Sequence, residues 1–209
     1  MNFEMLINRN HLLDETFIPD DLMITDNNEN NFHQFSNPNL KPMISKSIFP
    51  YFLKMQQDMK KLGLHIIIDS GYRSYDYQKD IFQRKIKELG IEKATNLVAL
   101  PGSSEHQSGL AFDIAIIRNG VYCKSSKPED KEIIWLMENS YKYGFILRYP
   151  KGKENITGYS FEPWHYRYVG TRLSNLLNKF EITLEEYYEQ KQEYDDINKN
   201  YYPIKHLKK

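Results

Sequence analysis

Two short segments of this chain place histidine and carboxylate side chains close together in the sequence. In the first segment, His106 ends a long connecting stretch, and Asp113 follows seven residues later inside an apolar run. In the second, Glu162 precedes His165 by three residues, with Pro163 between them. A catalytic zinc ion commonly takes three nitrogen or oxygen ligands from the protein and keeps a fourth position for water. His106, Asp113 and His165 would supply three such ligands, and Glu162 would be the carboxylate beside a zinc-bound water of lowered pKa.

Each of these residues also has an ordinary structural interpretation. A single histidine on a strand is more often packed or exposed than bound to a metal, and Glu162 fits a turn. Asp113 is harder to explain in that way, because a carboxylate in an apolar strand is costly to bury unless it is paired or metal-bound. Pro163 interrupts a regular strand, so Glu162 and His165 need not point to opposite faces. On spacing alone, zinc binding and purely structural roles are equally open.

Arg73 is a further candidate for chemistry. It closely follows the apolar run 64–68, at the end of a predicted buried strand where ligand-facing residues often lie. A guanidinium there could hold a substrate carboxylate through two parallel hydrogen bonds. On spacing alone, a surface salt bridge accounts for Arg73 better.

The segments that must position these residues predict an α+β fold, with helices flanking a small, mostly antiparallel sheet. Apolar runs rich in β-branched residues predict strands, and apolar residues at steps of three and four predict helices. The predicted strands are 64–68, 110–117, 145–149 and 164–169, with a hairpin at Asn119-Gly120. The predicted helices are 48–62, 75–89, 131–143 and 171–179, and a capping box at Thr183 begins another. We predict one domain over residues 1–209, with an irregular segment at 1–43, a long connection at 91–109, and a C-terminal helix and tail at 183–209.

Composition narrows the possible classes of protein. The 209 residues carry 28 Lys+Arg and 28 Asp+Glu, so no charge excess favours nucleic acid or an anionic membrane as a partner. The single cysteine, Cys123, excludes an internal disulfide and a Cys-rich zinc module. The N-terminus lacks the apolar run of a secretory signal, and no stretch approaches a membrane span of about 18 apolar residues. We therefore expect a soluble cytoplasmic protein. Its aromatic content is high, with 16 Tyr, and the tyrosines at 187, 188, 194, 201 and 202 fall outside every motif.

Four segments of the chain match known motifs in a fixed order. They are SGYRSY at 70–75 followed by Gln78, PGSSEHQSGLAFD at 101–113, YGFILRYP at 143–150, and EPWHYRYVG at 162–170. Together they resemble the VanY-type D-alanyl-D-alanine carboxypeptidases, which share a zinc-peptidase fold with VanX dipeptidases, bifunctional VanXY enzymes and the hedgehog signalling domain. The Ser-x-His-x-x-Gly-x-Ala-x-Asp and Glu-x-x-His patterns of the family are both complete. One departure is Ser108, which stands where threonine is frequent and keeps the hydroxyl.

The resemblance implies a role for each candidate residue. It implies one zinc ion per chain, bound by His106, Asp113 and His165. It makes Glu162 the general base, a contribution of typically about 10²–10⁴-fold, and Arg73 the group that polarises the scissile carbonyl and stabilises the oxyanion. The side chains implied to contact the substrate are Arg73, Gln78, Ser104 and Tyr149. Tyr149 and Trp164 could both line the pocket, but packing in the core is the favoured interpretation of Trp164.

The implied function is that of a zinc-dependent D,D-carboxypeptidase that removes terminal D-Ala from peptidoglycan precursor peptides, as glycopeptide-resistance enzymes do. Dipeptidase activity is a possible addition. An L,D-carboxypeptidase that acts on tetrapeptide stems is a first alternative. A non-catalytic, zinc-containing binding domain is a second, although the presence of both Glu162 and Arg73 argues against it. The sequence leaves D,D against L,D preference and the oligomeric state open.

Overall fold

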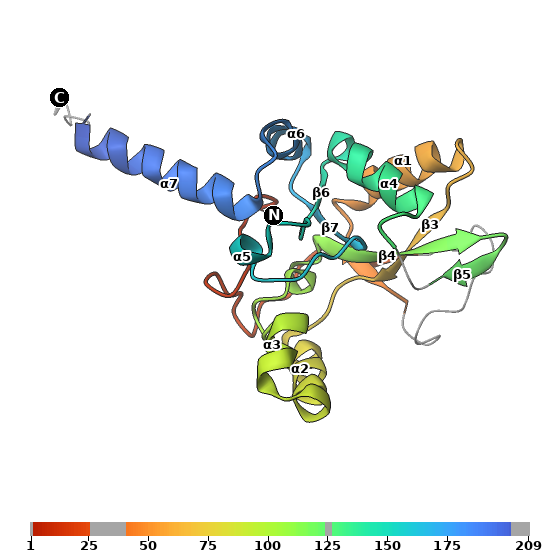
Figure 1. The fold of residues 1–209 in the computed structure, drawn as a ribbon, viewed down its shortest axis with the longest axis horizontal. Helices are drawn as coiled ribbons and strands as arrows, with labels where there is room; N and C mark the ends of the chain where they lie inside the picture. The colour runs from red at the N-terminus through yellow and green to blue at the C-terminus, as the bar shows by residue number, and fades with distance from the viewer. Residues whose placement is uncertain (1, 26–40, 124–126, 202–209) are drawn as a thin grey trace.

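The computed structural model describes residues 2–25, 41–123 and 127–201 (Figure 1). The strands are β1 (Leu22–Ile24), β2 (Met43–Ser45), β3 (Ile66–Ser70), β4 (Ala111–Arg118), β5 (Val121–Cys123), β6 (Phe145–Leu147) and β7 (His165–Tyr168). The α-helices are α1 (Phe49–Lys60), α2 (Tyr75–Leu89), α3 (Ile91–Leu97), α4 (Lys131–Asn139), α5 (Glu154–Thr157), α6 (Thr171–Phe180) and α7 (Leu184–Tyr201). Two 3-10 helices, η1 (Glu105–Ser108) and η2 (Ser140–Tyr143), complete the description.

The main sheet is antiparallel throughout, with strand order β3-β4-β7-β6, and β5 pairs with β4. Strands β1 and β2 form a separate antiparallel pair. Helices α1 and α4 pack beside the main sheet, whereas α2 and α3 project from another side of the molecule (Figure 1). The predicted α+β class with a small antiparallel sheet is therefore confirmed. The single-domain organisation stays a prediction.

Strand β4 separates the hydrophobic core from the polar face of the sheet. Because side chains alternate along a strand, Phe112, Ile114 and Ile116 point to one face, where they join Phe52 of α1 in the main core. Burying an apolar side chain of this size stabilises the fold by about 1.5–3 kcal/mol. Asp113 lies between two of these core residues and so points to the opposite face. The fold thus presents one carboxylate from the centre of its sheet.

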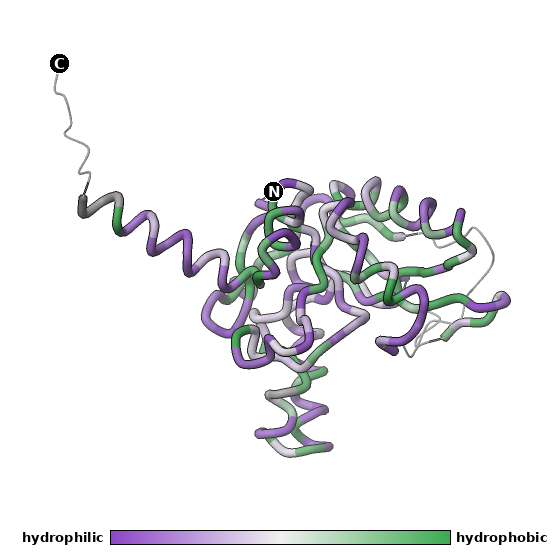
Figure 2. The backbone as a smooth tube through the Cα atoms, turned by 45° about the horizontal axis from the view of Figure 1, so that its top comes forward, coloured by the Kyte–Doolittle hydropathy of each residue, from purple (hydrophilic) through white to green (hydrophobic). Residues whose placement is uncertain are grey.

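Helix α7 leaves the body of the protein and is mostly hydrophilic along its length, whereas the strands are largely hydrophobic (Figure 2). Its first two turns are held to the rest of the chain, because Leu184, Tyr187 and Tyr188 pack in a second apolar cluster. Further along the helix Tyr194 is exposed. The packing at the start of the helix accounts for two of the tail tyrosines, while Tyr202 lies outside the described residues. No helix in the described ranges combines the length and apolarity needed to cross a bilayer.

Several short elements differ from the sequence expectation. Residues 1–43 were expected to be irregular, yet 22–24 pair with 43–45; residues 26–40 lie outside the description. The connection 91–109 contains α3 and η1, and the stretch between the predicted strands 145–149 and 164–169 contains α5. These elements have three to seven residues, too few to show an apolar period. Tertiary packing determines them instead, as the complete burial of Ala94 in α3 shows.

Candidate metal centre and active-site cleft

Two of the expected metal ligands face each other across neighbouring strands. The register of β4 and β7 places Asp113 directly opposite His165. Residues directly opposite in an antiparallel pair present their side chains on the same face. The Nδ1 atom of His165 consequently lies 3.1 Å from Oδ1 of Asp113. Sheet pairing, rather than proximity in the sequence, brings these two groups together.

The third expected ligand, His106, is held by a turn that follows β3. Its Nδ1 atom is 2.7 Å from the carbonyl oxygen of Gly71, and its Nε2 atom is 3.4 Å from Oδ1 of Asp113. Because a carbonyl only accepts hydrogen bonds, Nδ1 carries the proton and Nε2 keeps its lone pair toward Asp113. Gly71 must be glycine here, since a Cβ atom would lie 2.0 Å from the backbone oxygen of Met43. The glycine permits the close backbone approach that fixes His106.

Glu162 is brought to the same site by a tight turn. The amide of His165 donates to the carbonyl of Glu162 at 3.2 Å, which closes a four-residue turn with Pro163 in its second position. Proline is favoured there because its fixed φ suits the turn. The Oε2 atom of Glu162 lies 3.8 Å from Nδ1 of His165. Pro163 therefore allows a carboxylate and an imidazole three residues apart to share one site.

Arg73 approaches the site from the end of β3. Its Nη2 atom donates to Oδ2 of Asp113 at 2.7 Å. Its Nε and Nη2 atoms lie 3.2 and 3.0 Å from Oγ of Ser70, which itself pairs with Asp113 in the register of β3 and β4. Among the described residues, Nη1 of Arg73 has no hydrogen-bond partner. The guanidinium is thus oriented by two fixed groups and presents one donor edge to the site.

The geometry of the three ligand residues fits a zinc ion. Their candidate ligand atoms all lie within 4.8 Å of one another. Two nitrogens and one oxygen are a donor set that zinc commonly takes. With bonds of about 2.0–2.1 Å in tetrahedral geometry, neighbouring ligand atoms should be about 3.3 Å apart. The observed separations from Asp113 Oδ1, 3.4 Å to His106 Nε2 and 3.1 Å to His165 Nδ1, agree with that value.

Burial and neighbouring charges shift the pKa values of these groups. Burial raises the pKa of Glu162 to about 7. Burial, together with the Arg73 guanidinium, lowers the pKa of His106 to about 4. Burial lowers the pKa of His165. The carboxylates of Asp113 and Glu105 outweigh burial, however, and raise the pKa to about 9. A cation at the site would favour the deprotonated forms of all these groups. A carboxyl group whose pKa lies near 7 is well suited to accept and return a proton.

The eight residues singled out from the sequence line one cleft of about 230 Å³. They are Arg73, Gln78, Ser104, His106, Asp113, Tyr149, Glu162 and His165. Gln78 of α2 is buried, its Nε2 atom donates to the Ala99 carbonyl at 2.8 Å, and its Oε1 has no partner among the described residues. The ring of Tyr149 packs against that of His165 with centroids 4.9 Å apart and an angle of 43° between the ring planes.

The expectation for Trp164 was wrong. It is 37% exposed and lines the cleft instead of packing in the core. The physical reason is its place in the turn between Glu162 and His165, before β7 begins, where no strand alternation directs it inward. The apolar wall of the cleft is completed by Ile81 and Leu97, which the sequence did not single out.

Sequence reasoning also missed a buried group of charges next to the cleft. Glu105, Arg148 and Arg167 are all buried in the described structure. Burial raises the pKa of Glu105, but the two guanidiniums outweigh it and hold the pKa below its usual range. The sequence could have indicated this group, because Arg148 and Arg167 each interrupt a run of apolar and aromatic residues, as Asp113 does. A charge in such a position is costly unless it is paired.

Comparison with known proteins agrees with this arrangement. The family model described as D-alanyl-D-alanine carboxypeptidase (VanY) matches residues 41–171. The bifunctional D-Ala-D-Ala dipeptidase and D-Ala-D-Ala carboxypeptidase VanXYC of Enterococcus gallinarum is 34% identical over 202 residues, which cover 90% of this chain and 95% of the relative.

Two solved structures resemble the fold closely. The LdcB LD-carboxypeptidase has 41% sequence identity and a TM-score of 0.77, covering 88% of this chain and 84% of its own. A mutant of the vancomycin resistance D,D-pentapeptidase VanY from a VanB-type resistance cassette, in complex with Zn(II), has 34% identity and a TM-score of 0.73, covering 90% of this chain and 99% of its own.

Proposed function

Because this chain belongs to the VanY family of D-alanyl-D-alanine carboxypeptidases, we propose that it is a zinc-dependent D,D-carboxypeptidase. It would remove the terminal D-Ala of peptidoglycan precursor peptides, with one zinc ion per chain. The observation that carries the proposal is the convergence of three ligand atoms within 4.8 Å of one another, in a cleft that also contains Glu162 and Arg73. A zinc ion bound by these three ligands would supply Lewis acidity and a water of lowered pKa.

Glu162 is the proposed general base. Its carboxylate lies 3.8 Å from the ligand nitrogen of His165, close enough to reach a water at the metal position without being one of the three ligands. It would take a proton from the attacking water and pass it to the leaving amine. Burial of the carboxylate strengthens its hold on that proton, and a cation beside it would favour the proton's return.

Arg73 is the proposed oxyanion stabiliser. Asp113 and Ser70 hold its Nε and Nη2 atoms, so the guanidinium is already oriented before the substrate arrives. Fixed donors of this kind stabilise developing charge without reorganisation. Gln78, Ser104 and Tyr149 would hold the terminal residue of the peptide, since all three line the cleft.

A substrate panel tests this proposal. The purified, zinc-loaded protein is incubated with D-Ala-D-Ala, D-Ala-D-Ser, a tetrapeptide stem and a pentapeptide stem, and the products are identified by mass spectrometry. We expect release of one D-Ala from the pentapeptide stem. The matched control is Glu162→Gln, which keeps the size of the side chain and removes its basicity. Equal release by wild type and Glu162→Gln, or none by the wild type, would contradict the proposal.

An L,D-carboxypeptidase is the second candidate, because the LdcB LD-carboxypeptidase is 41% identical to this chain with a TM-score of 0.77. The same panel separates the two activities, since an L,D-carboxypeptidase removes D-Ala from the tetrapeptide stem. A non-catalytic zinc-containing domain would show bound zinc and no turnover with any of the four substrates. The placement of Glu162 and Arg73 in the cleft favours catalysis over this alternative.

A further inference from the structure

A completely buried carboxylate, Glu105, lies behind the proposed zinc ligands. Its side chain is 0% exposed, and it is flanked by Arg148 and Arg167, whose side chains are 1% and 0% exposed. Its Oε1 atom accepts hydrogen bonds from Nε of Arg148 at 2.7 Å and from Nη1 of Arg167 at 2.9 Å. Burying such charges is costly even when they are paired, and apolar residues of similar volume often stabilise a fold as well. Stability alone is therefore a weak reason for placing three charges here.

The second oxygen of Glu105 faces the metal centre. Its Oε2 atom lies 3.5 Å from Nε2 of His165, and both atoms are buried without a hydrogen-bond partner among the described residues, so each is the nearest group of opposite polarity for the other. The other ring nitrogen of His165, Nδ1, faces Asp113 at 3.1 Å. The imidazole thus lies between two carboxylates, one on the side of the metal ligands and one on the side of the buried arginines.

This arrangement determines which nitrogen of His165 is available to a metal. A zinc ion shared with Asp113 would need the lone pair of Nδ1, so the one proton of the neutral ring would lie on Nε2, where the Glu105 carboxylate can accept it. Resting on the zinc enzyme proposed above, we propose that Glu105 is a positioning residue, which holds the His165 ring in the orientation and tautomer needed to bind zinc. His106 has the matching arrangement, with the Gly71 carbonyl in place of a carboxylate.

The two arginines hold Glu105 in place and connect it to distant parts of the chain. Arg148 forms a bidentate pair with Glu185 at the start of α7, at 2.6 and 2.9 Å. Arg167 donates from Nη2 to the carbonyl oxygens of Phe3 and Met5 in the N-terminal segment. Because these partners lie on separate segments, Glu105 has little freedom to move away from His165.

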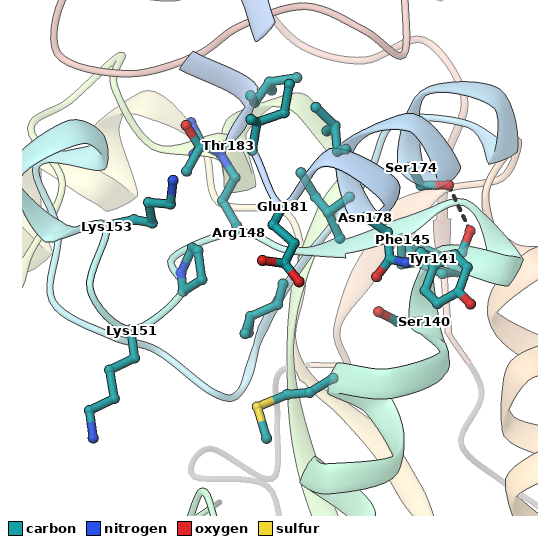
Figure 3. Close-up of a pocket in the computed structure, with 17 residues that line it drawn as sticks. Ser140, Tyr141, Phe145, Arg148, Lys151, Lys153, Ser174, Asn178, Glu181 and Thr183 are labelled. Atoms are coloured by element: carbon teal, nitrogen blue, oxygen red, sulfur yellow. Dashed lines mark hydrogen bonds between the residues drawn. The ribbon is translucent and has the colours of Figure 1, made fainter. Parts of the chain in front are cut away.

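Arg148 also lines a second cavity, of about 350 Å³, whose lining residues differ from those of the cleft. Figure 3 shows Arg148, Lys153 and Thr183 at one end of this cavity and Ser140, Tyr141 and Ser174 at the other, with Glu181 between them. Arg148 therefore lines this cavity with a side chain that is almost completely buried, and its Nε atom donates to Glu105.

Zinc affinity tests the proposal independently of turnover. The dissociation constant is measured by competition with a chromophoric chelator for wild type, Glu105→Gln and Glu185→Gln. Glu105→Gln keeps the shape and an acceptor for the arginines, but it can present an NH₂ group to His165. Loss of such an outer contact typically weakens metal binding by about 10–100-fold, which is the expected result. Glu185→Gln removes the same charge from Arg148 without touching His165, and we expect its zinc affinity to stay within about threefold of wild type.

A spectroscopic readout and a second variant complete the test. The visible spectrum of the Co²⁺-substituted protein should change in Glu105→Gln and match wild type in Glu185→Gln. If Glu105→Gln does not fold, the double variant Glu105→Gln/Arg148→Gln removes one charge of each sign and is measured in its place. Unchanged zinc affinity and an unchanged Co²⁺ spectrum would overturn the positioning role. Failure of the wild type to bind zinc would instead overturn the proposed function, and this inference with it.

Discussion

Replacing Arg73 by lysine tests the proposed catalytic role of its guanidinium most sharply. Its Nη2 atom is 2.7 Å from Oδ2 of Asp113, its Nε atom is 3.2 Å from Oγ of Ser70, and Nη1 remains to meet the substrate. A lysine has one nitrogen and can hold either Asp113 or the substrate, but not both. Loss of one oxyanion donor costs about 2.7–4 kcal/mol in the transition state. Since about 1.36 kcal/mol is a factor of ten, kcat should fall by about 10²–10³-fold.

The assay for Arg73→Lys separates kcat from KM for D-Ala release, at saturating zinc. A ground-state carbonyl carries little negative charge, so KM should rise by less than about tenfold. Zinc content is measured in the same preparations, because Arg73 also contacts the proposed ligand Asp113. A normal kcat with a raised KM would refute the reasoning, since Arg73 would then bind substrate without stabilising the transition state.

Three further predictions follow from other parts of the structure. Glu162→Gln should lower kcat by about 10²–10⁴-fold and leave zinc affinity nearly unchanged, since Glu162 is outside the ligand set; loss of zinc on dialysis would contradict this. Gly71→Ala should destabilise the protein by at least about 2 kcal/mol in urea unfolding, because the new Cβ meets the Met43 carbonyl, and wild-type stability would show that this turn can relax. Burial raises the pKa of Glu186, but hydrogen bonds from Lys153 and Thr183 outweigh it and leave the pKa lowered. A lowered carboxyl pKa stabilises the fold above the unfolded value of about 4.3 and ceases to do so in acid. Glu186→Gln should therefore lower Tm at pH 7 more than at pH 4, and an equal loss at both pH values would contradict that sign.

The longer elements of the fold could be predicted because their apolar patterns are local. The run at 64–68 and the alternation of Phe112, Ile114 and Ile116 specify strands that bury one or both faces. The Asn119-Gly120 pair predicts a tight hairpin, and both residues do take positive φ, 51° and 78°. The β1–β2 pair could not be found in this way, since strands of three residues carry no period and their pairing joins distant segments.

The candidate site was predictable as a set of residues but not as a geometry. The spacing of Glu162 and His165 gave no direction for either side chain until the turn at Pro163 placed them together. The contact between Asp113 and His165 depends on strand register, which is non-local. Glu105 stayed hidden for the same reason, because its partners Arg148 and Arg167 come from two other strand regions.

Stoichiometric zinc restoration tests the central claim most directly. The protein is stripped with a chelator, zinc is returned in measured amounts, and D-Ala release from a pentapeptide stem is followed by mass spectrometry. The account predicts that activity vanishes in the stripped protein, rises linearly with added zinc, and levels off at one zinc per chain. Release of D-Ala that survives complete removal of zinc, or that fails to return when zinc is restored, would contradict it.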